Sequence, residues 1–173
     1  MGNVTSYTYR PVTDDNIYTK YIDGAYPLCD IQGAFQVVSS LTRPNGNGGA
    51  QVTNYKYAGA KIHKRGKGFL GFSKFTATDL QTGISTTSTY EFEPTEFTVG
   101  LKRTETRLSK GSYSNKLLAE ADYTNTLQNY ETGVSTYLPT NVVEKKYDLT
   151  GANAYSQTAT SYTYDSYGEC IND

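Results

Sequence analysis

Turn-forming residues divide this 173-residue chain into short segments, and their spacing limits the possible folds more than any other feature. The segments between the turns are rich in Tyr, Thr, Val and Phe, the residues that favour β-strands. Residues 43–49 read RPNGNGG, where Asn-Gly supplies the positive φ angles of a tight hairpin turn. The pattern predicts an all-β fold of antiparallel hairpins with at least about eight strands. The expected strands are residues 5–10, 17–22, 35–42, 51–57, 69–79, 84–92, 99–108, 117–127, 142–147 and 155–164.

The composition favours the same fold class. The chain has 17 Tyr and no Trp, and Tyr and Thr suit a sheet with one packed face and one wet face. Helix-forming residues dominate no window, so no helix longer than about two turns is expected. Only residues 116–122, KLLAEAD, resemble a short helix, and they are predicted to be strand because the run YTNT at 123–126 continues them. Residues 1–173 are expected to form a single β-rich module, a fragment of a much larger protein.

The charge balance argues against nucleic acids and anionic membranes as partners. Sixteen basic and 17 acidic residues give a net charge of −1, so no overall field attracts either of them. The basic run KIHKRGK at 61–67 could contact phosphates while Tyr55 and Tyr57 stack on bases, but a solvated hairpin tip is the favoured interpretation. The longest apolar stretches are far too short to span a bilayer, and no signal-peptide pattern opens the chain.

Residues 66–71, GKGFLG, match the G-x-G-x-x-G pattern of dinucleotide-binding folds letter for letter. The pattern binds a pyrophosphate only where the loop leaves a strand and opens a helix. Here residues 72–79 continue as a β-branched and aromatic run, so neither a helix nor a nucleotide or other cofactor is predicted. Gly66, Gly68 and Gly71 are instead predicted to shape a turn that enters a strand, with the phenylalanines that follow packing into the sheet.

Catalytic and metal-binding chemistry finds little support in the sequence. With two cysteines and one histidine, the chain has no metal-ligand cluster. Cys29 and Cys170 lie near opposite ends, and two unpaired, partly buried thiols are favoured over a disulfide between them. Glycosidases need two carboxylates on either side of a sugar, and the spacing of three carboxylate pairs in this chain fixes no such arrangement. These pairs are therefore predicted to lie on a plain polar surface, and no enzymatic activity is expected. These pairs are Asp14/Asp15, Glu91/Glu93 and Glu120/Asp122.

The C-terminal part of the chain repeats a short motif. Y-D-x-x-G occurs twice, seventeen residues apart, with Tyr147, Asp148 and Gly151 in the first copy and Tyr164, Asp165 and Gly168 in the second. Weaker echoes lie at 78–83 and 129–133. Each Tyr is expected to end a strand and pack, each Asp to accept a backbone N–H two residues on, and each Gly to take the left-handed conformation. A period that yields one hairpin per unit is typical of a stacked array.

The second copy, TSYTYDSYG at 160–168, resembles the YD repeat of Rhs proteins. Upstream, the chain is similar to the stretch shared by toxin-complex (Tc) B components and related Rhs toxins, which precedes the Rhs core. The resemblance covers nearly the whole chain, and its most specific part runs from Tyr55 to Tyr90. The chain departs from the family at 91–97, which read EFEPTEF. The runs that carry the resemblance are residues 26–33, 37–41, 55–61, 66–72 and 78–90.

The resemblance implies a non-catalytic function. In such proteins a long antiparallel sheet curls into a hollow shell around a toxic C-terminal domain, and neighbouring segments of the shell are the partners. The chain is therefore expected to belong to a secreted bacterial toxin. The alternative is a cell-surface adhesion module whose exposed tyrosines stack on glycans. Because the terminal segments at 5–10 and 159–164 alternate Tyr with Thr or Ser and carry little to blunt a sheet edge, an isolated chain is also expected to form a homodimer or aggregates through them.

Overall fold

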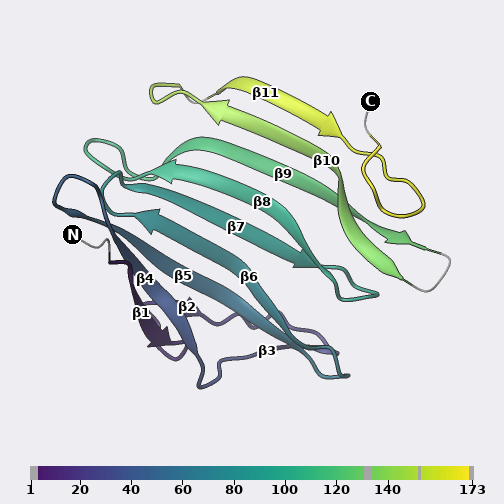
Figure 1. Cartoon of the computed structure of the whole chain (residues 1–173). Helices are drawn as coiled ribbons and strands as arrows, with labels where there is room; N and C mark the ends of the chain where they lie inside the picture. The colour runs from purple at the N-terminus through teal and green to yellow at the C-terminus, as the bar shows by residue number, and fades with distance from the viewer. Residues whose placement is uncertain (1–3, 131–133, 152, 172–173) are drawn as a thin grey trace. The chain divides into compact units, whose positions relative to one another are not determined.

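The computed structural model describes residues 4–130, 134–151 and 153–171. These residues form eleven β-strands and no helix, which confirms the predicted all-β fold (Figure 1). Residues 116–122, the one segment that resembled a helix, lie in a strand. The strands are β1 (Ser6–Pro11), β2 (Tyr18–Thr19), β3 (Leu28–Asp30), β4 (Gln36–Pro44), β5 (Ala50–His63), β6 (Gly68–Asp79), β7 (Ile84–Phe92), β8 (Val99–Leu108), β9 (Lys116–Asn129), β10 (Ser135–Tyr147) and β11 (Ala154–Ser161).

The strands join one sheet with the hydrogen-bonded order β1-β4-β5-β6-β7-β8-β9-β10-β11. From β4 onward, each strand lies beside the next one in sequence, as short turns between antiparallel neighbours require. The hairpin predicted at residues 43–49 joins β4 to β5, with Pro44 opposite Ala50. The order has two ends, β1 and β11, so the sheet does not close into a barrel. β2 and β3 both pair with β5 outside this order.

The predicted strand at 17–22 is much shorter in the structure, where only Tyr18 and Thr19 pair, in parallel, with β5. Tyr18 is fully buried, and its hydroxyl donates to the carbonyl of Ile31 at 2.7 Å. The same hydroxyl accepts the backbone N–H of Ala60 at 3.0 Å. The buried tyrosine side chain therefore helps to hold this segment against β5, and tertiary packing outweighs the strand preference of the local sequence.

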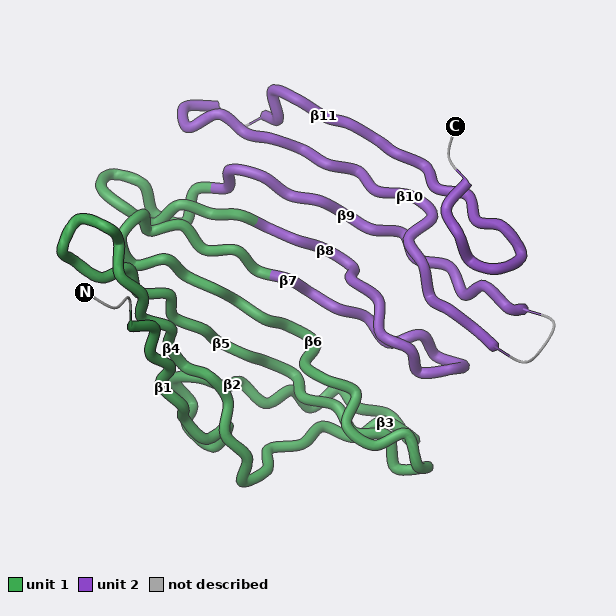
Figure 2. The backbone as a smooth tube through the Cα atoms, in the orientation of Figure 1, with its two compact units in different colours: residues 1–87, 106–116 green, residues 88–105, 117–173 purple. Residues whose placement is uncertain are grey.

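The chain separates into two compact units (Figure 2). Unit 1 comprises residues 1–87 and 106–116, and unit 2 comprises residues 88–105 and 117–173. In unit 1, Val12, Tyr18 and Ala60 form a fully buried core against which other apolar residues pack. Aromatic rings extend this core along β5 and β6, where Tyr57 lies 4.8 Å from Phe72 between ring centroids. Burial of apolar surface therefore stabilises unit 1.

Unit 2 buries a different kind of side chain. Its buried apolar residues are small, Ala121 and Val142, while the carboxylates Glu93 and Glu120 are only 6% and 8% exposed. β9 and β10 form a long antiparallel ladder that is interrupted by a bulge after Pro139. β11 continues the ladder on the other side of β10. The buried carboxylates require partners, because an unpaired charge in such a position is strongly unfavourable.

Candidate functional site

The three glycines of the G-x-G-x-x-G pattern lie in different places. Gly66 lies in the turn between β5 and β6, with φ 101°, and Gly68 is the first residue of β6, opposite His63, with φ 74°. Gly71, with φ 111°, instead lies inside β6 at a bulge, where the register shifts opposite Lys61 and leaves Leu70 as the extra residue. The turn joins two antiparallel strands, so no helix N-terminus stands behind it to receive a pyrophosphate.

The basic run at 61–67 is not a uniformly solvated tip, and that prediction is wrong for its first part. Lys61 and His63 are buried, at 5% and 6% exposed, and only the residues from Lys64 onward form the exposed turn. The ammonium of Lys61 lies 2.5 Å from Asp30 and also forms an ion pair with Asp23. Burial by itself lowers the pKa of Lys61, but its bonds to these two carboxylates hold it above the usual value. This ion-pair cluster ties the segment before β4 to β5.

The tyrosines near that run do not present free faces to bases. Tyr55 stacks on Phe75 at 5.6 Å between ring centroids, and Tyr57 packs against Phe72 and Phe75. The hydroxyl of Tyr57 donates to the carbonyl of Val38 at 2.9 Å. Both rings therefore belong to the packing of unit 1.

The two Y-D-x-x-G copies differ in conformation. In the second copy Asp165 accepts the N–H groups of Tyr167 and Glu169 at 2.8 and 2.9 Å, and Gly168 has φ 84°. In the first copy Asp148 accepts from Thr150 at 3.4 Å, but Gly151 has no positive φ. Tyr147 ends β10, as expected, whereas Tyr164 lies beyond β11 in an isolated bridge to Cys170. In the described residues between the copies there is one strand, β11, and not the expected hairpin.

The weaker echo at 78–83 fits the motif better than the first copy does. Asp79 ends β6 and accepts the N–H groups of Gln81 and Thr82 at 2.7 and 3.2 Å. Gly83 follows with φ 71°, and a β-carbon there would lie 2.9 Å from the carbonyl oxygen of Ser109. The echo at 129–133 extends outside the described residues. Among the described copies, only this one combines an Asp acceptor that ends a strand with a left-handed Gly.

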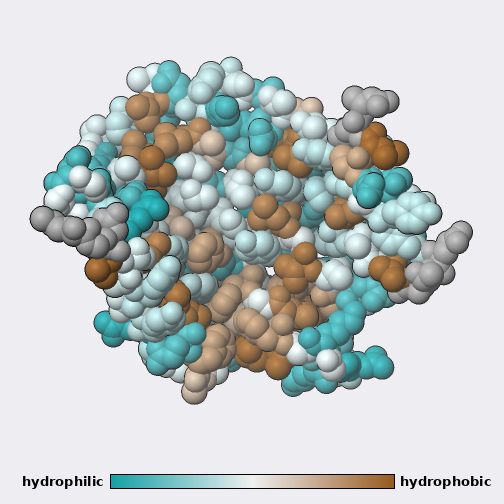
Figure 3. Space-filling model, in the orientation of Figure 1, coloured by the Kyte–Doolittle hydropathy of each residue, from teal (hydrophilic) through white to brown (hydrophobic). Residues whose placement is uncertain are grey.

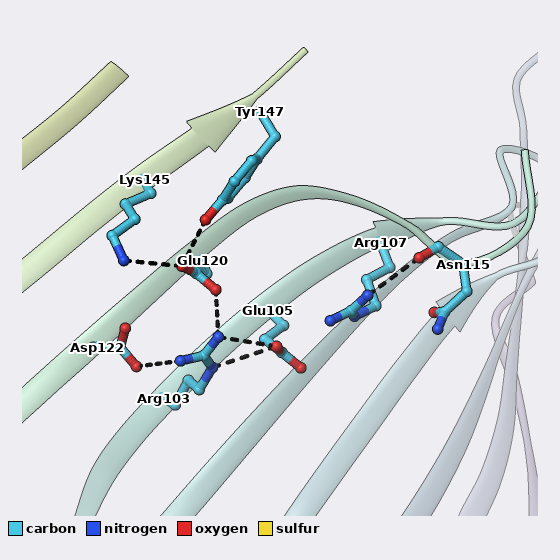
Figure 4. Close-up of polar contacts among 8 residues, drawn as sticks. All are labelled: Arg103, Glu105, Arg107, Asn115, Glu120, Asp122, Lys145 and Tyr147. Atoms are coloured by element: carbon cyan, nitrogen blue, oxygen red, sulfur yellow. Dashed lines mark hydrogen bonds and ion pairs between the residues drawn. The ribbon is translucent and has the colours of Figure 1, made fainter. Parts of the chain in front are cut away.

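Tyr147 connects its motif to a polar network across β8, β9 and β10 (Figure 4). Its hydroxyl donates to Glu120 at 2.7 Å, and Lys145 lies 3.3 Å from the same carboxylate. Arg103 forms an ion pair with Glu120 and lies 2.7 Å from Asp122 and 3.2 Å from Glu105. We call these six residues the Glu120 network: Arg103, Glu105, Glu120, Asp122, Lys145 and Tyr147.

The Glu120 network keeps a buried carboxylate ionised. Burial by itself raises the pKa of Glu120, but the hydrogen bonds from Tyr147 and Lys145 and the charge of Arg103 hold it below its ordinary value. Beyond this network in the same view, Arg107 donates to the carbonyl of Asn115 at 3.1 Å and ties the two ends of the β8–β9 turn (Figure 4). The prediction that Glu120 lies on a plain polar surface is therefore wrong.

A second network surrounds Glu91. The hydroxyl of Tyr137 donates to Glu91 at 2.7 Å, and the amide of Asn125 donates to the same oxygen at 3.1 Å. Lys102 lies 3.5 Å from the other oxygen. The ring of Tyr137 lies against Gly100, where a β-carbon would come within 2.6 Å of it. Burial and the bond to Glu91 raise the pKa of Tyr137 to about 12.

Glu93 closes the loop at which the chain departs from the resembled family. It accepts the N–H of Thr95 at 2.8 Å and that of Glu96, while the N–H of Phe97 bonds to its carbonyl at 2.9 Å. Burial raises the pKa of Glu93, but the backbone donors hold it below its ordinary value. Glu93 is thus a second exception to the predicted surface carboxylates, and its role is to shape a turn.

The carboxylates Glu91, Glu93 and Glu120 each face fixed hydrogen-bond donors, which hold their pKa values below the ordinary value and keep them in the charged form. Within the described ranges no group of His, Cys, Asp and Glu is arranged to hold a metal ion. Cys29 is half-buried and Cys170 is exposed, and both are free. No helix among the residues that the structure covers is long and apolar enough to cross a membrane.

Sequence reasoning missed the two networks, although a signal for them exists. Arg103 and Glu105 alternate along one strand-like run, and Glu120 and Asp122 alternate along the next. Side chains two residues apart lie on the same face of a strand, so opposite charges on adjacent strands are expected to meet. The alternation of charges predicts on which face of the sheet these side chains lie. Which charges meet depends on the register of the neighbouring strands.

Comparison with known proteins places the N-terminal part of the chain. A family model described as the insecticide toxin TcdB middle/N-terminal region matches residues 1–97, which is more than half of the chain. The match includes β1 to β7 and the glycine-containing turn between β5 and β6. Neither the curated proteins nor the solved structures contain a match to this chain. The chain belongs to the family of the insecticide toxin TcdB middle/N-terminal region.

Proposed function

We propose that this chain is a non-catalytic structural segment of a secreted toxin complex, and that it forms part of the wall of an Rhs-type shell around a toxic domain. The family membership supports a toxin-complex protein. The observation that carries the structural role is the open strand order, in which β1 and β11 stand at the two ends. An outer strand offers backbone N–H and C=O groups to another strand. Neighbouring segments of the same toxin are the partners that such edges would take.

The surface of the outer strands supports this assignment. Tyr7 and Tyr9 of β1 are each 57% exposed, and Tyr155 of β11 is 68% exposed. Apolar side chains are dispersed among polar ones on the face seen in Figure 3. Further strands added at β1 and β11 would cover these tyrosines and satisfy the edges. The glycan-binding alternative relies on the same tyrosines, and neither the family match nor the site geometry favours it.

Hydrogen exchange tests the edge assignment. The chain is compared with a longer version that includes the flanking sequence of its parent protein. We expect the outward-pointing amides of β1 and β11, which do not pair with β4 or β10, to exchange quickly in the chain alone and slowly in the longer protein, because new strands protect them. The amides of β5, which has neighbours on both sides, serve as the control and should be protected in both. Slow exchange of β1 and β11 in a monomeric isolated chain would contradict the proposal.

Encapsulation needs a separate measurement. In the full-length toxin, limited proteolysis should leave the toxic domain intact while the shell is closed. A variant whose shell is opened by a charged substitution in the buried core of unit 1, such as Ala60→Asp, should expose that domain to cleavage. Equal cleavage of the toxic domain in both proteins would contradict encapsulation. The proposal that β1 and β11 pair with neighbouring segments would not be affected by that result.

A further inference from the structure

We propose that unit 1 carries a binding pocket for a small oxyanion group, a phosphate or sulfate, formed by two lysines on adjacent strands. A pocket of about 300 Å³ opens beside β2, β5 and β6. Its volume corresponds to on the order of ten water molecules, which leaves room for the oxyanion and a small organic body. The lining residues are Thr19, Tyr21, Lys56, Tyr57, Ala58, Lys74 and Thr76.

The sheet register brings the two lysines to one face. Lys56 lies opposite Thr76, and Ala58 lies opposite Lys74. Because Lys56 and Ala58 are two residues apart on β5, both lysines project from the same face and stand diagonally across the strand pair. Two like charges on one face of a strand pair repel each other, and an anion bound between them relieves the repulsion. The pair is therefore arranged to gain from a bound dianion.

No protein carboxylate neutralises these lysines. The pocket lining contains no Asp or Glu. Neither ammonium has an ion-pair or hydrogen-bond partner among the residues that the structure describes, and both side chains are exposed. Elsewhere, Lys61, Lys102 and Lys145 each bind a carboxylate. Lys56 and Lys74 thus differ from the lysines that the fold uses for its own ion pairs.

Tyr21, another lining residue, is fixed by the close approach of its ring to the backbone of β5. A β-carbon at Gly59 would lie 2.5 Å from the Tyr21 ring, so the ring packs directly against this glycine. Gly59 also has φ 63°, and its carbonyl accepts the hydroxyl of Ser73 at 2.9 Å. Backbone pairing of Thr19 with Ala58 holds the second hydroxyl-bearing residue beside the lysines. The hydroxyls of Thr19 and Tyr21 can donate to the oxyanion while the two ammoniums supply the charge.

The pocket suits an oxyanion better than an apolar ligand or a metal cation. Two cationic groups oppose a bound cation, and hydroxyl and ammonium donors have no acceptor in an apolar ligand. Thr76, which also lines the pocket, shares a hydrogen bond of 3.0 Å with Thr87 and is fixed by it. This inference does not depend on the shell function, since it concerns side chains on a face of the sheet and not on its edges.

The test is a titration of the intact chain with sodium phosphate and, separately, sodium sulfate, at constant ionic strength set with sodium chloride. The readouts are the backbone amide NMR shifts of Thr19, Ala58 and Thr76. We expect saturable shifts that are confined to the pocket. Lys56→Gln and Lys74→Gln should each weaken binding about tenfold, the effect of losing one charge-assisted hydrogen bond. Lys146→Gln, which removes an exposed strand lysine of β10, is the matched control and should leave the affinity unchanged.

Sodium acetate is titrated as a third anion. The proposal would be overturned by the absence of a saturable shift, by shifts spread evenly over all lysine-rich surfaces, or by equal weakening through the control substitution. The variants replace exposed side chains and should fold, which circular dichroism verifies before each titration. A response to phosphate and sulfate but not to acetate would identify a tetrahedral dianion as the ligand group. A response to all three anions at equal strength would instead mean charge screening, and it would contradict a specific pocket.

Discussion

Unit 1 and unit 2 contribute strands to one sheet, but different kinds of buried side chain stabilise each unit. Unit 1 buries Val12, Tyr18 and Ala60 completely and surrounds them with aromatic rings. Unit 2 buries Glu93 and Glu120 and surrounds each of them with donors. Apolar burial tolerates many rearrangements, whereas a buried carboxylate is favourable only while its partners stay in place. The comparison predicts that the two units respond differently to substitutions and to pH.

The largest effect is expected in the core of unit 1. Tyr18→Ala should lower the free energy of unfolding by about 4 kcal/mol, because it removes a fully buried ring and leaves two backbone groups without their partner. A urea melt measures the change. Tyr9→Ala, which truncates a 57% exposed tyrosine of β1, is the control and should change stability by less than about 0.5 kcal/mol. Similar losses for both variants would mean that unit 1 has no dominant core.

The next effect concerns the Glu120 network of unit 2. Glu120→Gln should cost about 2–3 kcal/mol at neutral pH, because Arg103, Lys145 and Tyr147 lose a charged acceptor. The estimate is below that for a fully buried pair, since the Arg103 side chain is 37% exposed and screened by solvent. Glu144→Gln, an exposed carboxylate on β10, is the matched control.

The same variant has a defined pH dependence. The folded pKa of Glu120 lies below its usual value of 4.5, so its stabilisation is fully present above that pH and is lost as pH falls through the folded pKa. The difference between the wild type and Glu120→Gln should therefore shrink in acid. If the difference in unfolding free energy between the two proteins stays constant from pH 7 to pH 3, Glu120 stabilises the fold through its shape and hydrogen bonds and not through its charge.

A smaller effect is expected at the bulge of β6 in unit 1. Gly71→Val should cost about 1–2 kcal/mol, because a β-branched residue is strained at φ 111°. No atom lies within 4 Å of a β-carbon at this position, so the cost is backbone strain and not a clash. Lys67→Ala in the adjacent exposed turn should have an effect below about 0.5 kcal/mol. Equal effects in a denaturant melt would contradict a conformational requirement for the glycine.

The smallest effect concerns Tyr137 in unit 2. Tyr137→Phe should cost about 1 kcal/mol at neutral pH, because Glu91 keeps its contacts with Asn125 and Lys102. The folded pKa of Tyr137 is raised from 10.0 to about 12, so its stabilisation is present below pH 10 and is lost as pH rises toward 12. Chemical unfolding at pH 9 and pH 11.5 measures this. The wild type should lose more stability over that range than Tyr137→Phe, and equal losses would argue against the Glu91 contact.

Local turn chemistry predicted several strands well. β7 (Ile84–Phe92) and β8 (Val99–Leu108) have the predicted bounds, because the turns before and between them contain strong strand-ending residues. β10 begins at Ser135 and not at residue 142, because Pro139, which is disfavoured inside strands, is accommodated at a bulge. β5 extends to His63 and not to residue 57. Gly59 lies inside this strand, where the Tyr21 ring packs against it, and does not form a turn.

The sequence by itself determined the fold class and the strand-ending turns of this protein, because Asp, Asn, Gly and β-branched residues act on the backbone within a few positions of themselves. The tertiary structure decided which side chains are buried and which charges meet. Arg103 and Glu120 are seventeen residues apart, and their contact exists only in one register of β8 and β9. Lys56 and Lys74 likewise share a face because Ala58 pairs with Lys74. A slip of one residue would move every one of these side chains to the other face, which is why local sequence patterns did not reveal the two networks or the lysine pocket.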